Sequence, residues 1–224
     1  RVIEDACHAL GERYRNTAIG SCKHSDLAVF SFHPVKSITT GEGGAIATNS
    51  KTYYEKLLLL RSHGMHKGKD GKNVMIALGY NYRITDIQSA LGVSQLKKLA
   101  SFIKRRHQVA DYYRDELKNV KEIVIPEEIS GNYSSWHLYV IRVADVQARD
   151  ELKRYLLKNN IGVSFHYPAV YSHPFYQDEG YGRITLKNVD QYQKSCITIP
   201  CYPGLTQSDV KYIANVIKDF FKKT

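Results

Sequence analysis

Residues Ser31 to Gly44 read Ser-Phe-His-Pro-Val-Lys-Ser-Ile-Thr-Thr-Gly-Glu-Gly-Gly. This stretch connects two short apolar segments, 27–32 and 45–48, that we expect to be β-strands. It sets Lys36 among small residues and glycines, which favours a lysine held in a fixed place. A lysine amine becomes a useful nucleophile when its surroundings lower its pKa, typically for Schiff-base chemistry. A solvated lysine on a hairpin loop is the common alternative, but the flanking sequence argues against it.

The composition is that of a globular protein without a membrane span. The chain has 224 residues, of which 43% are hydrophobic and 24% charged, enough for one large or two modest domains. No apolar run is long enough to cross a bilayer, which excludes a membrane-spanning protein. The net charge of +10 comes from basic residues spread over predicted helices, such as Lys97, Arg105 and Lys222. A nucleic-acid-binding domain is therefore the less favoured alternative.

The cysteines and the first residues add two expectations. Cys7, Cys22, Cys196 and Cys201 have neither C-x-x-C spacing nor the density of a disulfide scaffold, so we expect reduced thiols and a cytoplasmic location. Residues 2–6 read as the end of a buried strand, and such a strand needs neighbours on both sides. We therefore expect a further N-terminal part of the fold.

Strand and helix signals alternate over the first hundred residues, which is typical of an α/β fold. Ser50 or Asn49 is expected to cap a helix that ends near Gly64. The glycine-rich, charged segment 66–73 is expected to be a mobile loop.

A capping box predicts the next helix. Thr85 and Gln88 have the required spacing, so a helix should begin there and present Ile87, Leu91 and Leu96 inward.

The pattern changes after a long predicted helix at 101–118, whose apolar positions include Val109, Tyr113 and Leu117. The elements that follow predict a compact α+β unit: strand 137–143, helix 149–159, strand 161–165 and a last amphipathic helix capped by Thr206. We place the domain boundary after residue 110, so that 1–110 form part of a large domain and 111–224 a small α+β domain.

Asp5 stands at the carboxyl end of the opening strand, where α/β folds collect ligand-binding groups. A carboxylate and a lysine are the minimal equipment for pyridoxal phosphate (PLP) chemistry, because the amine attaches the cofactor and the carboxylate keeps its pyridine nitrogen protonated. Taken alone, Asp5 would be a strand-end cap or an ion-pair partner. The stretch around Lys36 favours the cofactor interpretation.

Several other stretches, like the lysine stretch, resemble motifs of one known protein family. They are Val-Ile-Glu-Asp-Ala-Cys-His-Ala-Leu-Gly (2–11), Leu-Arg-Ser-His-Gly-Met (60–65), Gly-Tyr-Asn-Tyr-Arg (79–83), and the C-terminal runs 136–139, 166–168 and 199–205. With these, the whole chain resembles the nucleotide-sugar aminotransferases of the DegT/DnrJ/EryC1/StrS family. The resemblance implies an α/β, fold-type-I, PLP-dependent aminotransferase. The chain would hold the C-terminal portion of the large domain and the small C-terminal α+β domain.

The resemblance assigns roles to five residues. Lys36 corresponds to the catalytic lysine that forms a Schiff base with PLP and shuttles the proton, and Asp5 to the partner of the pyridine nitrogen. His8 occupies the position near the phenolic oxygen of the cofactor. Ser31 corresponds to the hydroxyl that binds the cofactor phosphate, and Asn81 to the amide that reaches this phosphate from the other subunit. A homodimer with shared active sites follows from the resemblance.

The resemblance also suggests substrate-binding residues. His166 and Tyr167 would line the sugar-nucleotide pocket at a strand end of the small domain. Arg83 would help to neutralise acidic groups, and a structural ion pair is an equal alternative for it.

Other aromatic and histidine residues are assigned to the structure. Trp136 and Tyr139 are predicted to be core aromatics. No metal site is expected, because His63 and His66 lack a third ligand in evident range.

Within the family, the motifs most resemble members of pseudaminic acid biosynthesis. The implied reaction transfers an amino group from glutamate to the C4 keto group of a UDP-linked 4-keto-6-deoxy amino sugar. The alternatives are an aminotransferase for another nucleotide-linked 3- or 4-keto sugar, and a truncated, cofactor-free remnant that acts as an interaction module. Family members carry a phosphate-binding loop and a ring-stacking aromatic residue upstream of the opening strand. We therefore expect these 224 residues alone to bind PLP poorly.

Overall fold

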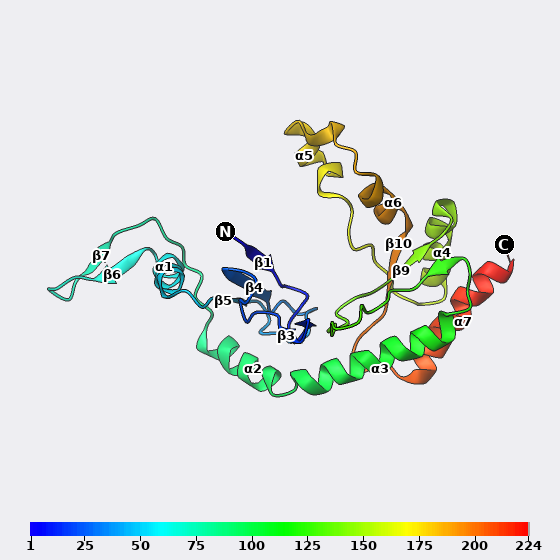
Figure 1. Ribbon diagram of the computed structural model, residues 1–224, viewed down its shortest axis with the longest axis horizontal. Helices are drawn as coiled ribbons and strands as arrows, with labels where there is room; N and C mark the ends of the chain where they lie inside the picture. The colour runs from blue at the N-terminus through cyan, green and yellow to red at the C-terminus, as the bar shows by residue number, and fades with distance from the viewer. Residues whose placement is uncertain (224) are drawn as a thin grey trace. The chain divides into compact units, whose positions relative to one another are not determined.

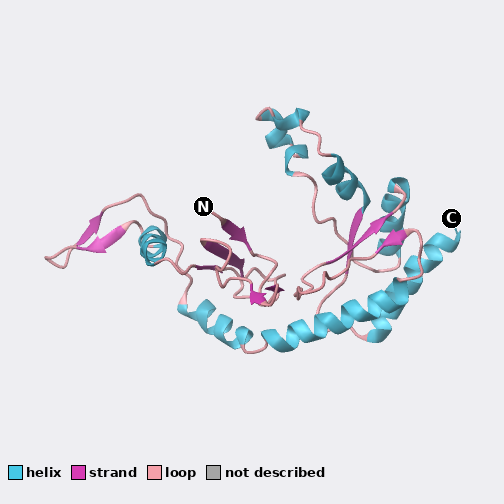
Figure 2. Ribbon diagram, in the orientation of Figure 1, coloured by secondary structure: helices cyan, strands magenta, loops and turns pink. Residues whose placement is uncertain are grey.

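The computed structural model describes residues 1–223, which form two compact units (Figure 1). Unit 1 comprises residues 1–103 and 129–135, and unit 2 comprises residues 104–128 and those from 136 onward. Both units combine helices and strands, as Figure 2 shows, in agreement with the predicted α/β class. The division into a large and a small domain after residue 110 stays a prediction.

A three-stranded mixed sheet forms the centre of unit 1. Its strands, in order across the sheet, are β1 (Ile3–Asp5), β4 (Leu27–Ser31) and β5 (Gly44–Ala47). β1 runs parallel to β4, whereas β5 runs antiparallel to it. The unit also contains β2 (Arg13–Tyr14), β3 (Thr17–Ala18), α1 (Lys51–Arg61), β6 (Met65–Lys67), β7 (Asn73–Met75), α2 (Asp86–Leu96) and the start of α3 (Leu99–Leu117). A small apolar core of Ala6, Ala28 and Phe30 lies at the central strand.

Short-range capping determines where the helices of unit 1 begin. The Ser50 hydroxyl accepts the Tyr53 N–H at 3.4 Å and caps α1, which ends at Arg61. The predicted capping box of α2 is confirmed, because Thr85 Oγ1 accepts the Gln88 N–H at 3.3 Å and Gln88 Oε1 accepts the Thr85 N–H at 3.0 Å.

The predicted loop at 66–73 is shorter in the structure, because its two ends belong to strands and only residues 68–72 form the connection. β6 and β7 form an antiparallel hairpin in which Met65 pairs with Met75 and Lys67 with Asn73. The Gly68 N–H donates to the Lys72 carbonyl at 2.8 Å and closes the turn. The glycines of this segment lie in the turn between the two paired strands.

The prediction that α2 buries its apolar face is also wrong within the described residues. Ile87 is 86% exposed, and Leu91 and Leu96 are 42% and 49% exposed. The periodicity of a helix shows which face is apolar, but it does not show whether another part of the same chain covers that face.

Unit 2 is an antiparallel sheet packed against helices. Its strand order is β10 (Cys196–Ile199), β9 (Tyr139–Val143) and β8 (Ile123–Val124). The remaining elements are α4 (Val146–Lys158), η1 (Val170–Ser172), α5 (Pro174–Asp178), η2 (Tyr181–Arg183), α6 (Lys187–Ser195), α7 (Gln207–Lys223) and most of α3. One large core contains the predicted positions of α3 together with Trp136 and Tyr139, which confirms the core assignment of both aromatics.

Two details of unit 2 differ from the predictions. The predicted strand 161–165 is absent from the described residues as a continuous strand, and only Ser164 pairs, through an isolated bridge to Thr198. The helix predicted to begin at 149 begins at Val146, because the Asp145 carboxylate caps it by accepting the Gln147 N–H at 2.8 Å. No helix among residues 1–223 is long and apolar enough to cross a membrane.

Candidate active site

Asp5 ends β1 beside the central strand of unit 1. It is paired in register with Val29 of β4, and its carboxylate oxygen Oδ1 accepts the Cys7 N–H at 3.1 Å. Hydrogen bonds from the Cys7 side chain and backbone lower the pKa of Asp5, and electrostatic interactions with His8 and Lys36 lower it further. Asp5 is therefore an ionised carboxylate at neutral pH, within electrostatic range of Lys36 and His8.

Lys36 lies at the end of a tight turn that follows β4. The Lys36 N–H donates to the His33 carbonyl at 3.0 Å, and Pro34 occupies the second turn position, where its fixed φ is favourable. Lys36 is half-buried, and Ser37 and Ile38 directly after it are buried. The backbone of Lys36 is thus part of an anchored turn rather than of a free loop.

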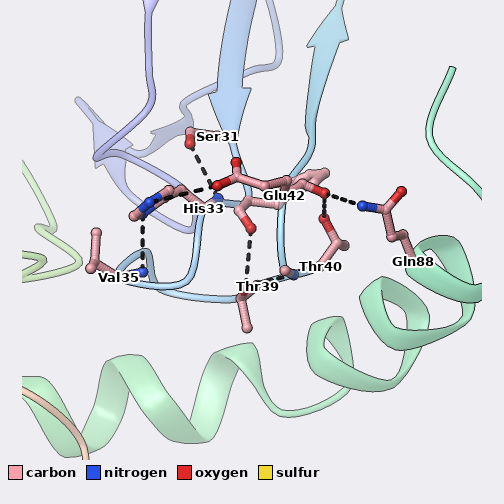
Figure 3. Close-up of polar contacts among 9 residues, drawn as sticks. Ser31, His33, Val35, Thr39, Thr40, Glu42 and Gln88 are labelled. Atoms are coloured by element: carbon pink, nitrogen blue, oxygen red, sulfur yellow. Dashed lines mark hydrogen bonds and ion pairs between the residues drawn. The ribbon is translucent and has the colours of Figure 1, made fainter. Parts of the chain in front are cut away.

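Backbone and hydroxyl groups close the connection around this turn, and Figure 3 shows the hydroxyl contacts of Thr39 and Thr40. The Phe32 N–H donates to the Gly43 carbonyl at 2.8 Å, at the base of the connection. The Phe32 carbonyl accepts both the Thr40 N–H and the Thr39 hydroxyl at 3.0 Å. The segment that holds Lys36 is therefore a closed loop with fixed ends.

Ser31 is the last residue of β4 and lies opposite Gly44 of β5. Its hydroxyl oxygen accepts the His33 N–H at 3.3 Å and can still donate its own proton. A Cβ at Gly44 would lie 2.5 Å from the Phe30 carbonyl oxygen, so this close strand pairing requires glycine. Because β1 and β4 are neighbouring parallel strands, the side chains of Asp5 and Ser31 lie at the same edge of the sheet.

His8 is held by residues that the sequence analysis did not identify. The Ser135 hydroxyl lies 2.9 Å from the His8 carbonyl oxygen and 2.9 Å from Glu12 Oε1, which also accepts the Ser135 N–H at 2.9 Å. Ser135 is completely buried. No local motif signals this contact, because the paired residues are more than 120 positions apart in the sequence.

Asn81 and Arg83 lie on the segment that leads into α2, and both are exposed. The segment is anchored to the end of α1, because the His63 N–H donates to the Tyr80 carbonyl at 2.8 Å and Asn81 forms a bridge with Ser62. Within the described chain, no hydrogen bond or ion pair joins Asn81 or Arg83 to the residues around Lys36.

His166 and Tyr167 belong to unit 2. His166 Nδ1 lies 2.8 Å from the Thr198 hydroxyl, and its carbonyl accepts the Tyr192 hydroxyl at 2.9 Å. The Tyr167 ring packs edge-on against the His166 ring and is 55% exposed. The two residues follow a bridge rather than the end of a strand, which corrects the predicted setting but keeps an exposed aromatic group beside an anchored imidazole.

The residues around Asp5 fit the cofactor that the sequence resemblance implies. PLP chemistry needs an amine for attachment, a carboxylate that stays ionised, and donors for a phosphate. Asp5 and Ser31, at the ends of β1 and β4, and Lys36, on the turn that follows β4, are residues that would provide these groups. Among residues 1–223, no group of three or more His, Cys, Asp and Glu side chains could hold a metal ion.

The mixed sheet with its lysine connection and the antiparallel α+β unit have the architecture of the fold-type-I aminotransferases. A family model for the DegT/DnrJ/EryC1/StrS aminotransferase family matches residues 1–218. The chain belongs to this family, as its motifs predicted.

Three relatives show how far the likeness extends. The UDP-4-amino-4,6-dideoxy-N-acetyl-beta-L-altrosamine transaminase of Campylobacter jejuni is 38% identical over 224 residues, covering 99% of this chain and 59% of the relative. PseC of Helicobacter pylori, an aminotransferase of pseudaminic acid biosynthesis, superposes with a TM-score of 0.93 at 33% identity, covering 99% of this chain and 60% of PseC. Spr1654 of Streptococcus pneumoniae, solved in PLP and PMP forms, gives a TM-score of 0.89 at 27% identity, covering 99% of this chain and 57% of Spr1654. The chain thus spans about three fifths of these relatives.

Proposed function

We propose that the chain provides the lysine-bearing part of a PLP-dependent sugar-nucleotide aminotransferase. The reaction transfers an amino group from glutamate to the C4 keto group of a UDP-linked 4-keto-6-deoxy amino sugar, in pseudaminic acid biosynthesis. The observation that carries the proposal is Lys36, held on a closed connection beside the ionised carboxylate of Asp5. The names of the Campylobacter and Helicobacter relatives support the class of substrate.

The residues of the site have distinct roles in this proposal. PLP, when bound, supplies an electron sink for the reacting carbon. The Asp5 carboxylate would keep a proton on the ring nitrogen, and His8 would face the phenolic oxygen. The Ser31 hydroxyl would donate to the phosphate, and Asn81 of a second protomer would bind the same phosphate. The Lys36 amine would hold the cofactor and move the proton at the reacting carbon.

A homodimer is part of the same proposal. Asn81 and Arg83 are exposed, and within the described chain neither bonds to the residues around Lys36, as a contribution to a second copy requires. Arg83, His166 and Tyr167 are proposed to contact the sugar nucleotide. The proposed location is the cytoplasm, where the four unpaired cysteines of the chain would stay reduced. The division into a large domain (1–110) and a small domain (111–224) completes the proposal.

Cofactor attachment tests the proposal directly. The whole protein should develop an absorbance band near the visible edge on addition of PLP, and borohydride reduction followed by peptide mass mapping should locate the adduct at Lys36. Lys36→Ala should lose both signals, whereas Lys69→Ala, an exposed lysine of the β6–β7 turn, should keep them. A band that persists in Lys36→Ala, or its absence from the wild type, would show that the proposal is wrong.

Substrate class needs a separate measurement. Turnover of the UDP-linked 4-keto sugar should exceed that of its epimer, because the pocket must distinguish the configuration at the neighbouring carbons. Equal rates for the two sugars would contradict the narrower assignment and favour another nucleotide-linked keto sugar.

A further inference from the structure

Gln88 links the connection that carries Lys36 to the start of α2 (Figure 3). Its Nε2 donates to the Glu42 carbonyl at 3.0 Å. Its Oε1 accepts both the backbone N–H and the hydroxyl of Thr85, each at 3.0 Å. One side chain therefore completes the helix cap and binds the lysine connection at the same time.

The Glu42 carbonyl belongs to the frame that closes the lysine loop. The Thr40 hydroxyl donates to the same carbonyl at 2.8 Å. Thr40, two residues before Glu42, and Gly43, directly after it, make the two closing bonds: the Thr40 N–H donates to the Phe32 carbonyl, and the Gly43 carbonyl accepts the Phe32 N–H. A donor that holds Glu42 in place thus restrains the bonds that define the loop around Lys36.

Helix α2 contacts the connection at a second point on the same face. Gly92, four residues after Gln88, is buried, and a Cβ there would lie 3.0 Å from Thr40 Cγ2. Thr40 is itself only 3% exposed. The glycine allows the helix to approach closely, and this approach brings the Gln88 amide within reach of Glu42.

We propose that Gln88 is a positioning residue that holds Lys36 in a fixed relation to the segment carrying Asn81. Gln88 restrains the lysine loop through its bond to the Glu42 carbonyl. It restrains the phosphate-binding segment through its bonds to Thr85, four residues after Asn81. The inference rests on the proposed function, because these two segments act together only as parts of a cofactor site. In a homodimer, Gln88 would connect the lysine of one site to the asparagine that serves the other.

A pair of variants separates this role from helix capping. Gln88→Glu keeps oxygens that accept from Thr85, as a standard capping box does, but it has no N–H to donate to Glu42. Thr85→Ala weakens the cap and leaves the Gln88–Glu42 bond in place. In Gln88→Glu, the Thr40 amide should exchange its hydrogen about five- to tenfold faster, the effect of one lost hydrogen bond, with the Ser89 amide of α2 unchanged. Thr85→Ala should show the reverse pattern.

The exchange measurement needs no cofactor, so it stands apart from the test of Lys36. A role in capping alone predicts wild-type exchange at Thr40 in Gln88→Glu, and that result would overturn the proposal. With PLP present, Gln88→Glu should also weaken PLP affinity about tenfold. Thr85→Ala removes one bond to Gln88 but keeps the backbone N–H that donates to Gln88 Oε1, so it should weaken PLP affinity less. Wild-type affinity in Gln88→Glu would overturn the coupling to the cofactor site. A wild type that shows no PLP band would overturn the proposed function itself, whatever the exchange pattern.

Discussion

Arg106 provides a direct test of how unit 2 is stabilised. It lies on α3, is 5% exposed, and its Nη1 is 3.0, 3.2 and 2.6 Å from the carbonyl oxygens of Trp136, His137 and Cys201. Nη1 carries two hydrogens, so the three carbonyls share two N–H groups. Each hydrogen bond from a charged donor contributes about 1.5–3 kcal/mol net. Burial of the cation, which lowers the pKa of Arg106, offsets part of this gain.

We therefore predict that Arg106→Met lowers the free energy of unfolding of unit 2 by about 3 kcal/mol, because it leaves buried carbonyls without a donor. Urea unfolding followed by the fluorescence of Trp136, the one tryptophan of the chain and 5% exposed, reports on this core. With a slope of about 2 kcal/mol per molar urea, the midpoint should fall by about 1.5 M.

Two controls accompany this variant. Lys104→Met changes an exposed residue of the same helix and should alter stability by less than about 0.5 kcal/mol. Arg106→Lys keeps the charge but loses the planar fork, so its loss should be intermediate. An Arg106→Met midpoint within about 0.5 M of the wild type would refute the reasoning, because the guanidinium bonds would then be no better than bonds to water.

Two further predictions concern unit 1. Gly79→Ala places a Cβ 2.1 Å from the Gly64 nitrogen, so the backbone must move, at a cost of about 2–3 kcal/mol in the free energy of unfolding. The expected result is faster hydrogen exchange of the amides at the Gly64 contact. Gly162→Ala, where an added Cβ would meet nothing within 4 Å, is the control. The hydrogen bonds from Cys7 lower the folded-state pKa of Asp5, so its stabilisation is present above about pH 4 and is lost as the pH falls through that lowered pKa. Asp5→Asn should therefore flatten the fall of the urea midpoint below pH 4, and an unchanged pH dependence would contradict this.

Signals that act over one helical turn were reliable guides to this fold. The Thr85–Gln88 capping box predicted the start of α2 because both partners lie on the same turn. The periodicity of 101–118 predicted α3 and its buried positions, since those residues pack against elements of the same unit. Whether Ile87 is buried or exposed could not be predicted in this way, and in the structure it is exposed. Burial depends on what covers the helix, and the helix sequence contains no information about that.

Some of the polar contacts that support the candidate site are long-range, and motifs identify its reactive groups better than these supports. Lys36 and Asp5 stand in recognisable local patterns, whereas the carbonyl of His8 depends on Ser135, 127 residues further along the chain. Such a bond forms only after the chain between its partners has folded, so neither residue carries a local mark of it. Gln88 is the intermediate case: its bond to Thr85 is visible as a capping box, while its bond to a backbone carbonyl 46 residues away is not. Residues with one local and one distant partner are therefore the places where sequence motifs understate a functional role.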